Sequence, residues 1–373
     1  MKMHIVAGAR PNLLKVAPLL RAAREKYFGE IDCLFIHTGQ HYDDSLSKVF
    51  IEDLEIPQPD VNFGVGSLPQ AHQVGVIMEK YERLCAATMP DVLVVVGDTN
   101  SSLGCALAAA KLPCKIAHVE AGLRRHDMTI PEEVNRVLID KVSDYHFPPH
   151  ERAATNLHSD GYIYNSIHRV GDVMIDTLIY ALRKLKQGGG SITSNAVRPY
   201  VLCTLHRPVN VDNKENLQQI LEALDIINQS HAAVVLPLHP RTHKRMLEFD
   251  LDHYMETLRP IGPVGYLDFV ALMKSASLII TDSGGIQPEA VFLGVPCVTL
   301  LDATVHPFSE ACGINQTVPC DTDSIYKEAV HALRGDRAIR PYNDEWWDGR
   351  AAERILHILV RDHAGTHNST THG

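Results

Sequence analysis

Three acidic side chains in the first half of the chain lie in loops that follow short apolar runs. Asp98 follows the run Val92–Val96. Glu120 comes directly after the run Ile116–Val119, and Glu132 opens the helical pattern that comes next. A single carboxylate at such a place is often a helix cap or a group that favours the helix dipole. Three of them in one domain indicate acid/base chemistry, because crowded carboxylates raise one another's pKa.

Two cations near the N-terminus could hold phosphate oxygens. Arg10 lies in a glycine-containing turn after the run Met3–Ala7, and Lys15 lies one turn into the following helix. The alternative is a tight turn beside a solvated lysine, and this segment alone does not favour either interpretation. The turn has neither Walker A nor GxGxxG spacing, so it indicates neither ATP nor NAD.

Two histidines stand at the ends of strand-like runs in the second half of the chain. His206 precedes Arg207, and His239 follows the run Ala233–Leu238. Histidine has the unperturbed pKa nearest neutrality, so it can transfer protons or pair with phosphate. A histidine at a strand end is as often structural, and both interpretations stay open at this point.

A glycine-rich turn near residue 284 is typical of an anion site. Ser283, Gly284 and Gly285 join a strand-like run to a helical pattern. Their hydroxyl and unhindered N–H groups at a helix N-terminus could bind a diphosphate. Glu289 follows one turn later, where a carboxylate could accept the two hydroxyls of a ribose. The turn therefore favours ligand binding over a plain connection.

The elements that must position these residues alternate between strands and helices, which predicts parallel α/β sheets. A chain of 373 residues fits two domains. We expect the first at 1–172, the second at 173–345, a helix at 346–362 that packs on the first, and a disordered tail at 363–373. The strand-like runs are Met3–Ala7, Cys33–His37, Val92–Val96, Ile116–Val119, Tyr145–Phe147, Ile167–Val170, Val201–Leu205, Ala233–Leu238, Leu278–Thr281 and Val295–Leu300.

Two such domains imply a cleft, and ligands of open parallel sheets bind beyond the carboxyl ends of the strands. All the loops named above lie at such ends. We therefore expect one acid-rich face, from the first domain, and one phosphate-holding face, from the second.

Composition excludes several classes of function. The net charge is −10, so a concentrated basic footprint for nucleic acid is not expected. The N-terminal apolar run is too short for a signal peptide, and no run reaches the roughly 18 residues of a membrane helix. The eight cysteines form no CxxC pair, which indicates buried thiols rather than zinc ligands or disulfides. A cytoplasmic protein without a membrane partner is expected.

Ten motifs in unbroken order, over about residues 1–335, resemble those of the non-hydrolysing UDP-N-acetylglucosamine 2-epimerases. The resemblance implies two Rossmann-like domains of the GT-B type, a homodimer, and neither metal nor cofactor. The motifs are GARPN (8–12) with Lys15, TGQHYD (38–43), GDTN (97–100), HVEAGLR (118–124), PEEVNR (131–136), GDVMID (171–176), LHRPVN (205–210), LHPRT (238–242), GYLDF (265–269) and TDSGGIQPEA (281–290).

The resemblance also implies a reaction, in which UDP is eliminated to leave 2-acetamidoglucal and is added back after reprotonation at the other face. The implied product, UDP-N-acetylmannosamine, feeds cell-surface polysaccharide synthesis. The residues matched to catalysis are Asp98, Glu120, Glu132 and His206. Those matched to holding the sugar, the diphosphate or UDP are Arg10, Lys15, Ser283, Gly284, Gly285 and Glu289. Arg136, Arg207 and His239, which stand in the same motifs, are further candidates for substrate binding.

Departures from the family pattern lie in the second half. Pro288 replaces an acid of the usual QEE, and the segment Leu301–Pro307 lacks two arginines and a glutamate of the usual pattern. The form associated with allosteric activation by UDP-N-acetylglucosamine is absent, and no such activation is expected. Three alternatives remain: an epimerase of another UDP-sugar such as UDP-2,3-diacetamido-glucuronate, a hydrolysing epimerase, or a GT-B binding protein or glycosyltransferase.

Overall fold

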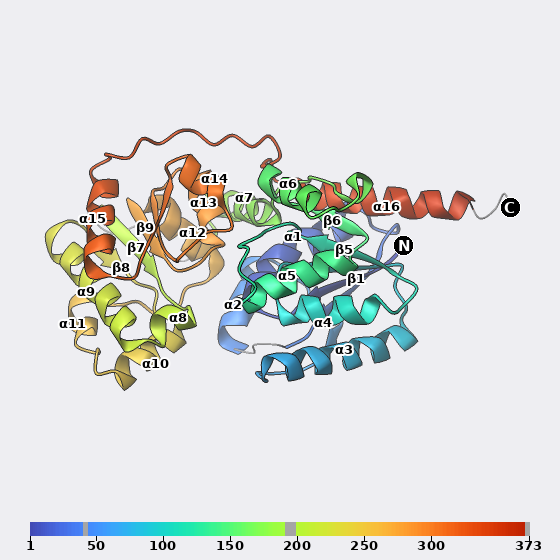
Figure 1. Cartoon of the computed structure of the whole chain (residues 1–373), viewed down its shortest axis with the longest axis horizontal. Helices are drawn as coiled ribbons and strands as arrows, with labels where there is room; N and C mark the ends of the chain where they lie inside the picture. The colour runs from blue at the N-terminus through green and yellow to red at the C-terminus, as the bar shows by residue number, and fades with distance from the viewer. Residues whose placement is uncertain (40–43, 191–198, 370–373) are drawn as a thin grey trace. The chain divides into compact units, whose positions relative to one another are not determined.

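The computed structural model describes residues 1–39, 44–190 and 199–369 (Figure 1). The chain divides into two compact units, one formed by Met1–Tyr180 with Asp344–Gly373 and the other by Ala181–Asn343. The division falls inside the helix α7 (Val173–Lys186) rather than at its start. The physical reason is that the first half of α7 is buried in the first unit, where Thr177 donates to the main-chain oxygen of Leu14 at 2.6 Å.

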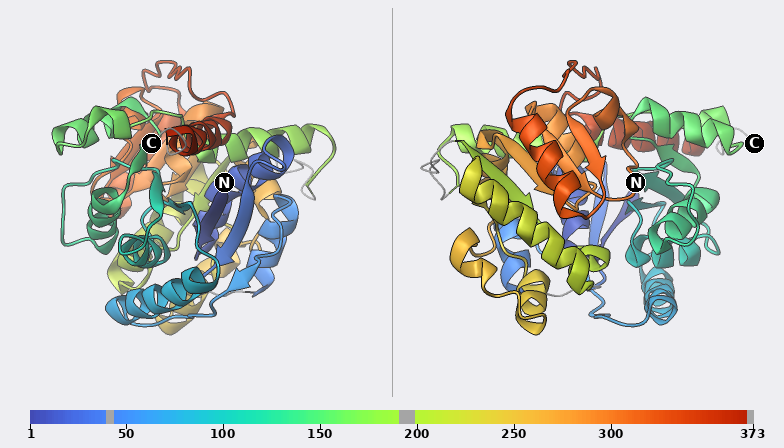
Figure 2. Two further views of the ribbon diagram at one scale, coloured as in Figure 1. Left: turned by 90° about the vertical axis from the view of Figure 1, so that its right-hand side faces the viewer. Right: turned by 60° about the vertical axis from the view of Figure 1, so that its left-hand side comes forward.

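The first unit is built on a six-stranded sheet of order β3-β2-β1-β4-β5-β6, and its neighbouring strands run parallel to one another (Figure 2). Its strands are β1 (Lys2–Ala7), β2 (Asp32–His37), β3 (Val61–Asn62), β4 (Val92–Val96), β5 (Lys115–Val119) and β6 (Tyr145–Phe147). Its helices are α1 (Arg10–Lys26), α2 (Asp44–Asp53), α3 (Gln70–Ala87), α4 (Asn100–Ala109), α5 (Pro131–Val142), α6 (Glu151–Ser159), the 3-10 turn η1 (Tyr164–Ser166) and α16 (Ala351–Ser369).

The second unit is built on a five-stranded parallel sheet of order β11-β10-β9-β7-β8. Its strands are β7 (Tyr200–Thr204), β8 (Ala233–Val235), β9 (Leu278–Thr281), β10 (Cys297–Leu300) and β11 (Asn315–Val318). Its helices are α8 (Pro208–Val211), α9 (Lys214–Ser230), α10 (Pro240–Glu248), α11 (Tyr254–Leu258), α12 (Tyr266–Ser275), α13 (Ile286–Leu293), α14 (Pro307–Ala311) and α15 (Thr322–Leu333). The predicted pair of Rossmann-like, parallel-sheet domains is confirmed.

In each sheet there is a point where the order of successive strands reverses, and the loops that carry the candidate residues lie there. In the first unit this point lies between β1 and β4, and in the second between β7 and β9. A crevice forms beyond the carboxyl ends of the strands at such a point, because the helices that follow lie on opposite faces. The loops after β1, β4, β7 and β9 carry most of the residues predicted to bind or react.

The central strands were predicted well because both of their faces are buried. Every residue of β4 is buried, which explains its unbroken run of Val and Leu. The edge strands β3 and β11 were missed, since β3 has two residues and β11 reads Asn-Gln-Thr-Val. β8 is shorter than predicted and ends at Val235, because Pro237 cannot donate a ladder hydrogen bond.

Two predictions on the chain's later segments were wrong. Ile167–Val170 is not a strand, since only Ile167 bridges to His146 after the 3-10 turn η1. The tail expected from residue 363 is helical as far as Ser369, because α16 continues beyond the segment that packs on α1. Within the described residues, no helix is long and apolar enough to cross a membrane.

Candidate active site

Lys15 and Glu120 form a largely enclosed ion pair in the first unit. Lys15 lies on the first turns of α1 and donates to the Glu120 carboxylate, which directly follows β5. Burial alone would lower the pKa of Lys15, but the negative charges of Glu120 and Asp98 outweigh it and raise the pKa. Lys15 is therefore charged near neutral pH. The two residues are far apart in the sequence, and the strand order β1-β4-β5 brings them together.

A second ion pair joins Asp98 to Arg136 on α5. Arg136 also donates to Glu133 at 2.8 Å, and Asn135 donates to the main-chain oxygen of Asp98 at 2.8 Å. Burial alone would raise the pKa of Asp98, but Arg136 and Lys15 outweigh it and lower the pKa. The prediction that crowded acids raise one another's pKa is thus wrong for Asp98, because a cation lies beside it.

The two glutamates that open α5 have different roles. Glu133 is buried and accepts from the N–H groups of Arg125 and His126 at 2.9 Å each, so it fixes the preceding loop. Glu132 is exposed at the first turn of the same helix. The structure brings Lys15, Glu120, Asp98 and Arg136 together, and it leaves Glu132 at the surface of this unit.

The backbone beside the first ion pair is in an uncommon conformation. Glu120 has a φ of 71°, in the left-handed region that a residue with a Cβ rarely occupies. Gly97 has a φ of 64°, and a Cβ there would lie 2.8 Å from Lys15 Nζ and 3.0 Å from Glu120 Oε2. A side chain at position 97 would displace the ends of Lys15 and Glu120, and the left-handed φ also favours glycine there. Such local strain is characteristic of functional sites.

Asp172 is an ionisable group that the sequence reasoning did not select. Burial and the negative charge of Glu120 raise its pKa to about 7. The carboxylate accepts from the N–H of Met174 at 2.8 Å, which anchors the start of α7. Asp172 lies in the motif GDVMID, and its burial is the property that the sequence did not reveal.

In the second unit, the buried carboxylate of Asp282 contacts both the side chain and the backbone of the loop that carries His206. Its Oδ1 lies 2.9 Å from His206 Nδ1, and its Oδ2 accepts from the N–H groups of His206 and Arg207 at 2.9 and 2.8 Å. Burial alone would raise the pKa of Asp282, but the hydrogen bonds and charge of His206 outweigh it and lower the pKa. The His206 side chain is 42% exposed, so its other nitrogen, Nε2, can reach a ligand.

His239 and Arg207 lie near the same loop. The ring of His239 is centred 5.9 Å from that of His206, and its Nδ1 accepts from the N–H of Arg241 at the start of α10. Arg207 Nη2 lies 3.8 Å from where a Cβ on Gly284 would be. The structure thus gathers the predicted binding residues that follow β7, β8 and β9.

The Ser283–Gly285 turn leads into α13. The N–H of Ser283 donates to Thr281 Oγ1 at 3.0 Å. Among the described residues, no hydrogen bond uses the N–H groups of Gly284 and Gly285. Both glycines have room around them, so a diphosphate oxygen could approach the backbone closely.

The departures from the family pattern have structural explanations. Pro288 lies in the first turn of α13, where its missing N–H costs no helical hydrogen bond. In the segment Leu301–Pro307, Thr304 donates to Gln287 Oε1 at 2.5 Å, and Ser309 donates to the same oxygen at 3.2 Å. Gln287 therefore ties this segment to α13.

Glu289 is buried and accepts a hydrogen bond from Tyr266 at 2.6 Å. Burial raises its pKa to about 7. The predicted ribose acceptor is thus not presented at the surface of the unit. The side chain of Arg10 and residues 40–43 of the motif TGQHYD lie outside the described part of the structure.

Glu289→Gln is expected to flatten the pH dependence of stability. A carboxyl whose pKa rises on folding stabilises the protein below its unfolded pKa, and this contribution is lost as pH rises through about 7. The variant should match the wild type at pH 4 to 5 and exceed it by roughly 3 kcal/mol at pH 8. Urea unfolding at both pH values measures the difference. Equal stability differences at the two pH values would contradict this.

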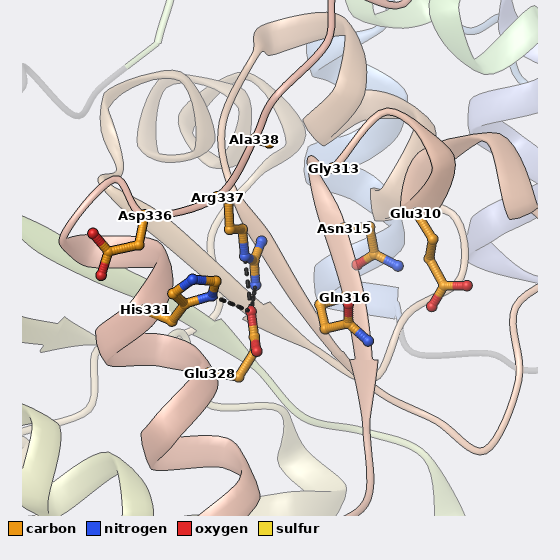
Figure 3. Close-up of a pocket in the computed structure, with 9 residues that line it drawn as sticks. All are labelled: Glu310, Gly313, Asn315, Gln316, Glu328, His331, Asp336, Arg337 and Ala338. Atoms are coloured by element: carbon orange, nitrogen blue, oxygen red, sulfur yellow. Dashed lines mark hydrogen bonds and ion pairs between the residues drawn. The ribbon is translucent and has the colours of Figure 1, made fainter.

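A polar cavity of about 190 Å³ lies at the other end of the second sheet (Figure 3). Arg337 spans it, pairing with Glu328 at 2.9 Å and donating to the main-chain oxygens of Cys297 and Ile314 at 2.9 and 2.8 Å. These oxygens lie at the starts of β10 and β11, so the cavity is away from the strand ends that carry the candidate site.

Comparison with known proteins identifies the family. The model of the UDP-N-acetylglucosamine 2-epimerase family matches residues 24–360. The chain belongs to this family. It is 40% identical to a UDP-N-acetylglucosamine 2-epimerase of Methanocaldococcus jannaschii, over 96% of this chain and 99% of the relative. It is 37% identical to the UDP-2,3-diacetamido-2,3-dideoxy-D-glucuronate 2-epimerase of Pseudomonas aeruginosa, over 97% of this chain and 100% of the relative.

Solved structures agree with this membership. The crystal structure of the M. jannaschii UDP-GlcNAc 2-epimerase, described as a complex with UDP-GlcNAc and UDP, matches with a TM-score of 0.87 at 40% identity. The match covers 97% of this chain and all of that one. A lipopolysaccharide galactosyltransferase matches with a TM-score of 0.51 at 14% identity, which shows a shared fold alone. The chain is therefore an enzyme of the UDP-sugar epimerase family.

Proposed function

We propose that this epimerase converts UDP-N-acetylglucosamine into UDP-N-acetylmannosamine. A base removes the C2 proton as the bond between C1 and the phosphate oxygen breaks, which releases UDP and leaves 2-acetamidoglucal. A proton is then delivered to the opposite face of C2 while UDP adds back to C1. Atoms and charge balance without a metal, an oxidant or a cofactor.

The observation that carries this proposal is the pair of partly buried salt bridges Lys15–Glu120 and Asp98–Arg136, at the point where the strand order of the first sheet reverses. Carboxylates held at fixed positions can take and return a proton, and adjacent cations stabilise negative charge that develops on the leaving phosphate. Glu132 is the third proposed acid. It is exposed on the first turn of α5, where a substrate can contact it.

The second unit holds UDP in this proposal. Gly284, Gly285 and the hydroxyl of Ser283 bind the diphosphate, with His206, Arg207 and His239 beside it. Glu289 reaches the ribose once its bond to Tyr266 opens. Arg10 and Lys15, two cations of the first unit, are proposed to bind phosphate oxygens. His206, backed by Asp282, can donate a proton or a hydrogen bond to the departing phosphate.

Incubation with UDP-N-acetylglucosamine in heavy water, followed by proton NMR, tests this function. The expected result is deuterium at C2 together with a manno product. Release of free sugar would support a hydrolysing epimerase instead. Absence of exchange with UDP-N-acetylglucosamine and related UDP-sugars would contradict every elimination mechanism and favour a GT-B binding protein or glycosyltransferase.

A second UDP-sugar remains a specific alternative substrate. The Pseudomonas relative named for UDP-2,3-diacetamido-2,3-dideoxy-D-glucuronate covers as much of the chain as the N-acetylglucosamine relatives do. The segment Leu301–Pro307 also differs from the family pattern. Competition of both sugars in the same exchange assay separates the two substrates. The proposal also includes a homodimer, which light scattering would test. It further includes a cytoplasmic location and a role in cell-surface polysaccharide synthesis.

A further inference from the structure

A network of buried hydrogen bonds around His118 and Asp140 lies next to the acid-bearing loops of the first unit. His118, on β5, is fully enclosed. Its Nδ1 lies 2.6 Å from Asp140 Oδ1 on α5, and its Nε2 lies 3.0 Å from the main-chain oxygen of Gly97. Neither residue belongs to the groups assigned to the reaction.

Both ring nitrogens of His118 lie within hydrogen-bond distance of an oxygen atom. A carbonyl oxygen only accepts, so Nε2 carries a proton toward Gly97. Asp140 also accepts from the N–H of Gly122 at 3.1 Å and pairs with Arg124 at 2.7 Å. Burial alone would raise the pKa of Asp140, but His118 and Arg124 outweigh it and lower the pKa. The carboxylate of Asp140 is therefore charged, and it holds one side of the His118 ring while the main-chain oxygen of Gly97 holds the other.

This hydrogen-bond network connects the three segments that bear the proposed acids, namely the turn after β4, the turn after β5 and helix α5. The bond to Gly97 fixes the turn that carries Asp98. Asp140 fixes the Glu120–Gly122 turn through the N–H of Gly122, and it lies on the helix that bears Arg136. The parallel ladder reaches only the first residue of each turn, through the N–H of Gly97 to Val119 O at 2.9 Å and the N–H of Glu120 to Phe147 O at 3.1 Å. The left-handed residues then turn the backbone away from the ladder, so the shape of each turn depends on other contacts.

We propose that His118 and Asp140 are positioning residues that hold the Gly97–Asp98 turn, the Glu120–Gly122 turn and α5 in one arrangement. The proposal rests on the proposed function, since it concerns the geometry of Asp98 and Glu120. Neither residue touches the substrate. The pair acts by keeping the two carboxylates within reach of the same carbon atom, a requirement that a displacement of about 1 Å can defeat.

His146 provides a matched control. It lies opposite His118 in the register of β5 and β6, on the same face of the sheet, and is equally buried. Its Nε2 lies 2.8 Å from the main-chain oxygen of Asp140, and its Nδ1 lies 3.2 Å from Ser166 Oγ. It contacts neither turn. A purely structural role would make His118 and His146 equivalent.

The test compares His118→Gln, Asp140→Asn, their double variant and His146→Gln in the full-length enzyme. For His118→Gln, kcat should fall roughly 30-fold while KM and the Kd for UDP change by less than about 3-fold. The double variant should lose no more than the larger single loss, because one linkage is broken in both. His146→Gln should lower the Tm but keep kcat within about 3-fold of the wild type.

Amide hydrogen exchange supplies a readout that does not need activity. His118→Gln should speed exchange in the peptides covering both turns, and His146→Gln should not. Equal loss of kcat in the two histidine variants, or an unchanged kcat and unchanged exchange in folded His118→Gln, would overturn the proposal. If the wild type shows no epimerisation, the proposed function fails, while the exchange data still decide whether the pair holds the turns.

Discussion

Glu120→Gln is expected to abolish deuterium exchange at C2, with kcat reduced at least about 1000-fold. Glutamine keeps the size of the side chain but cannot accept the proton, and Lys15 loses the charge that pairs with it. The affinity for UDP should stay nearly unchanged, because Glu120 is not among the residues proposed to bind UDP. Proton NMR in heavy water and calorimetric titration with UDP measure the two effects.

Glu55→Gln is the matched control for this variant. Glu55 also has a left-handed backbone, with a φ of 53°, and its carboxylate accepts from Tyr180 at 2.7 Å in the same unit. Its replacement should leave exchange at C2 intact. A large loss of UDP affinity in Glu120→Gln would show instead that Glu120 supports the structure rather than the proton transfer.

Gly97→Ala is expected to lower kcat about 100-fold through a single added methyl group. The new Cβ would lie 2.8 Å from Lys15 Nζ and 3.0 Å from Glu120 Oε2, so the ends of these two side chains must shift from their present positions. The left-handed backbone adds a cost of about 1 kcal/mol to folding. Steady-state kinetics and thermal unfolding of the variant give the two contributions separately.

Gly29→Ala separates the methyl contact from the backbone strain. Gly29 has a φ of 83°, and nothing lies within 4 Å of a Cβ built there. It should lose similar stability and keep full activity. Comparable activity of Gly97→Ala and Gly29→Ala would mean that the Lys15–Glu120 contact is not needed for turnover.

The sequence located the acids and histidines because they interrupt apolar strands at their carboxyl ends. It did not predict their partners. Asp98 meets Arg136, and Glu120 meets Lys15, only through the strand order of the sheet. For this reason the direction of the Asp98 pKa shift was predicted wrongly, and the cations were assigned to phosphate alone.

Burial was the other property that the sequence could not supply. Asp172 and Glu289 have pKa values raised to about 7 because their carboxyls are enclosed, and local composition does not show enclosure. The edge strand β11 was missed for a related reason. Its Asn-Gln-Thr-Val sequence has no apolar run, and tertiary pairing with β10 makes it a strand.

The second unit is formed by one continuous stretch of sequence, whereas the first unit is formed by two. Residues 181–343 form the second unit without interruption, whereas the first unit needs both 1–180 and α16. Asp176 on α7 accepts from the N–H groups of Ala351 and Ala352 at 3.1 and 2.8 Å, which closes the first unit. During synthesis the ribosome completes the second unit before it makes α16. The first unit, which bears the acids, can therefore complete its fold only after α16 has been synthesised. By then all residues of the second unit have already been made.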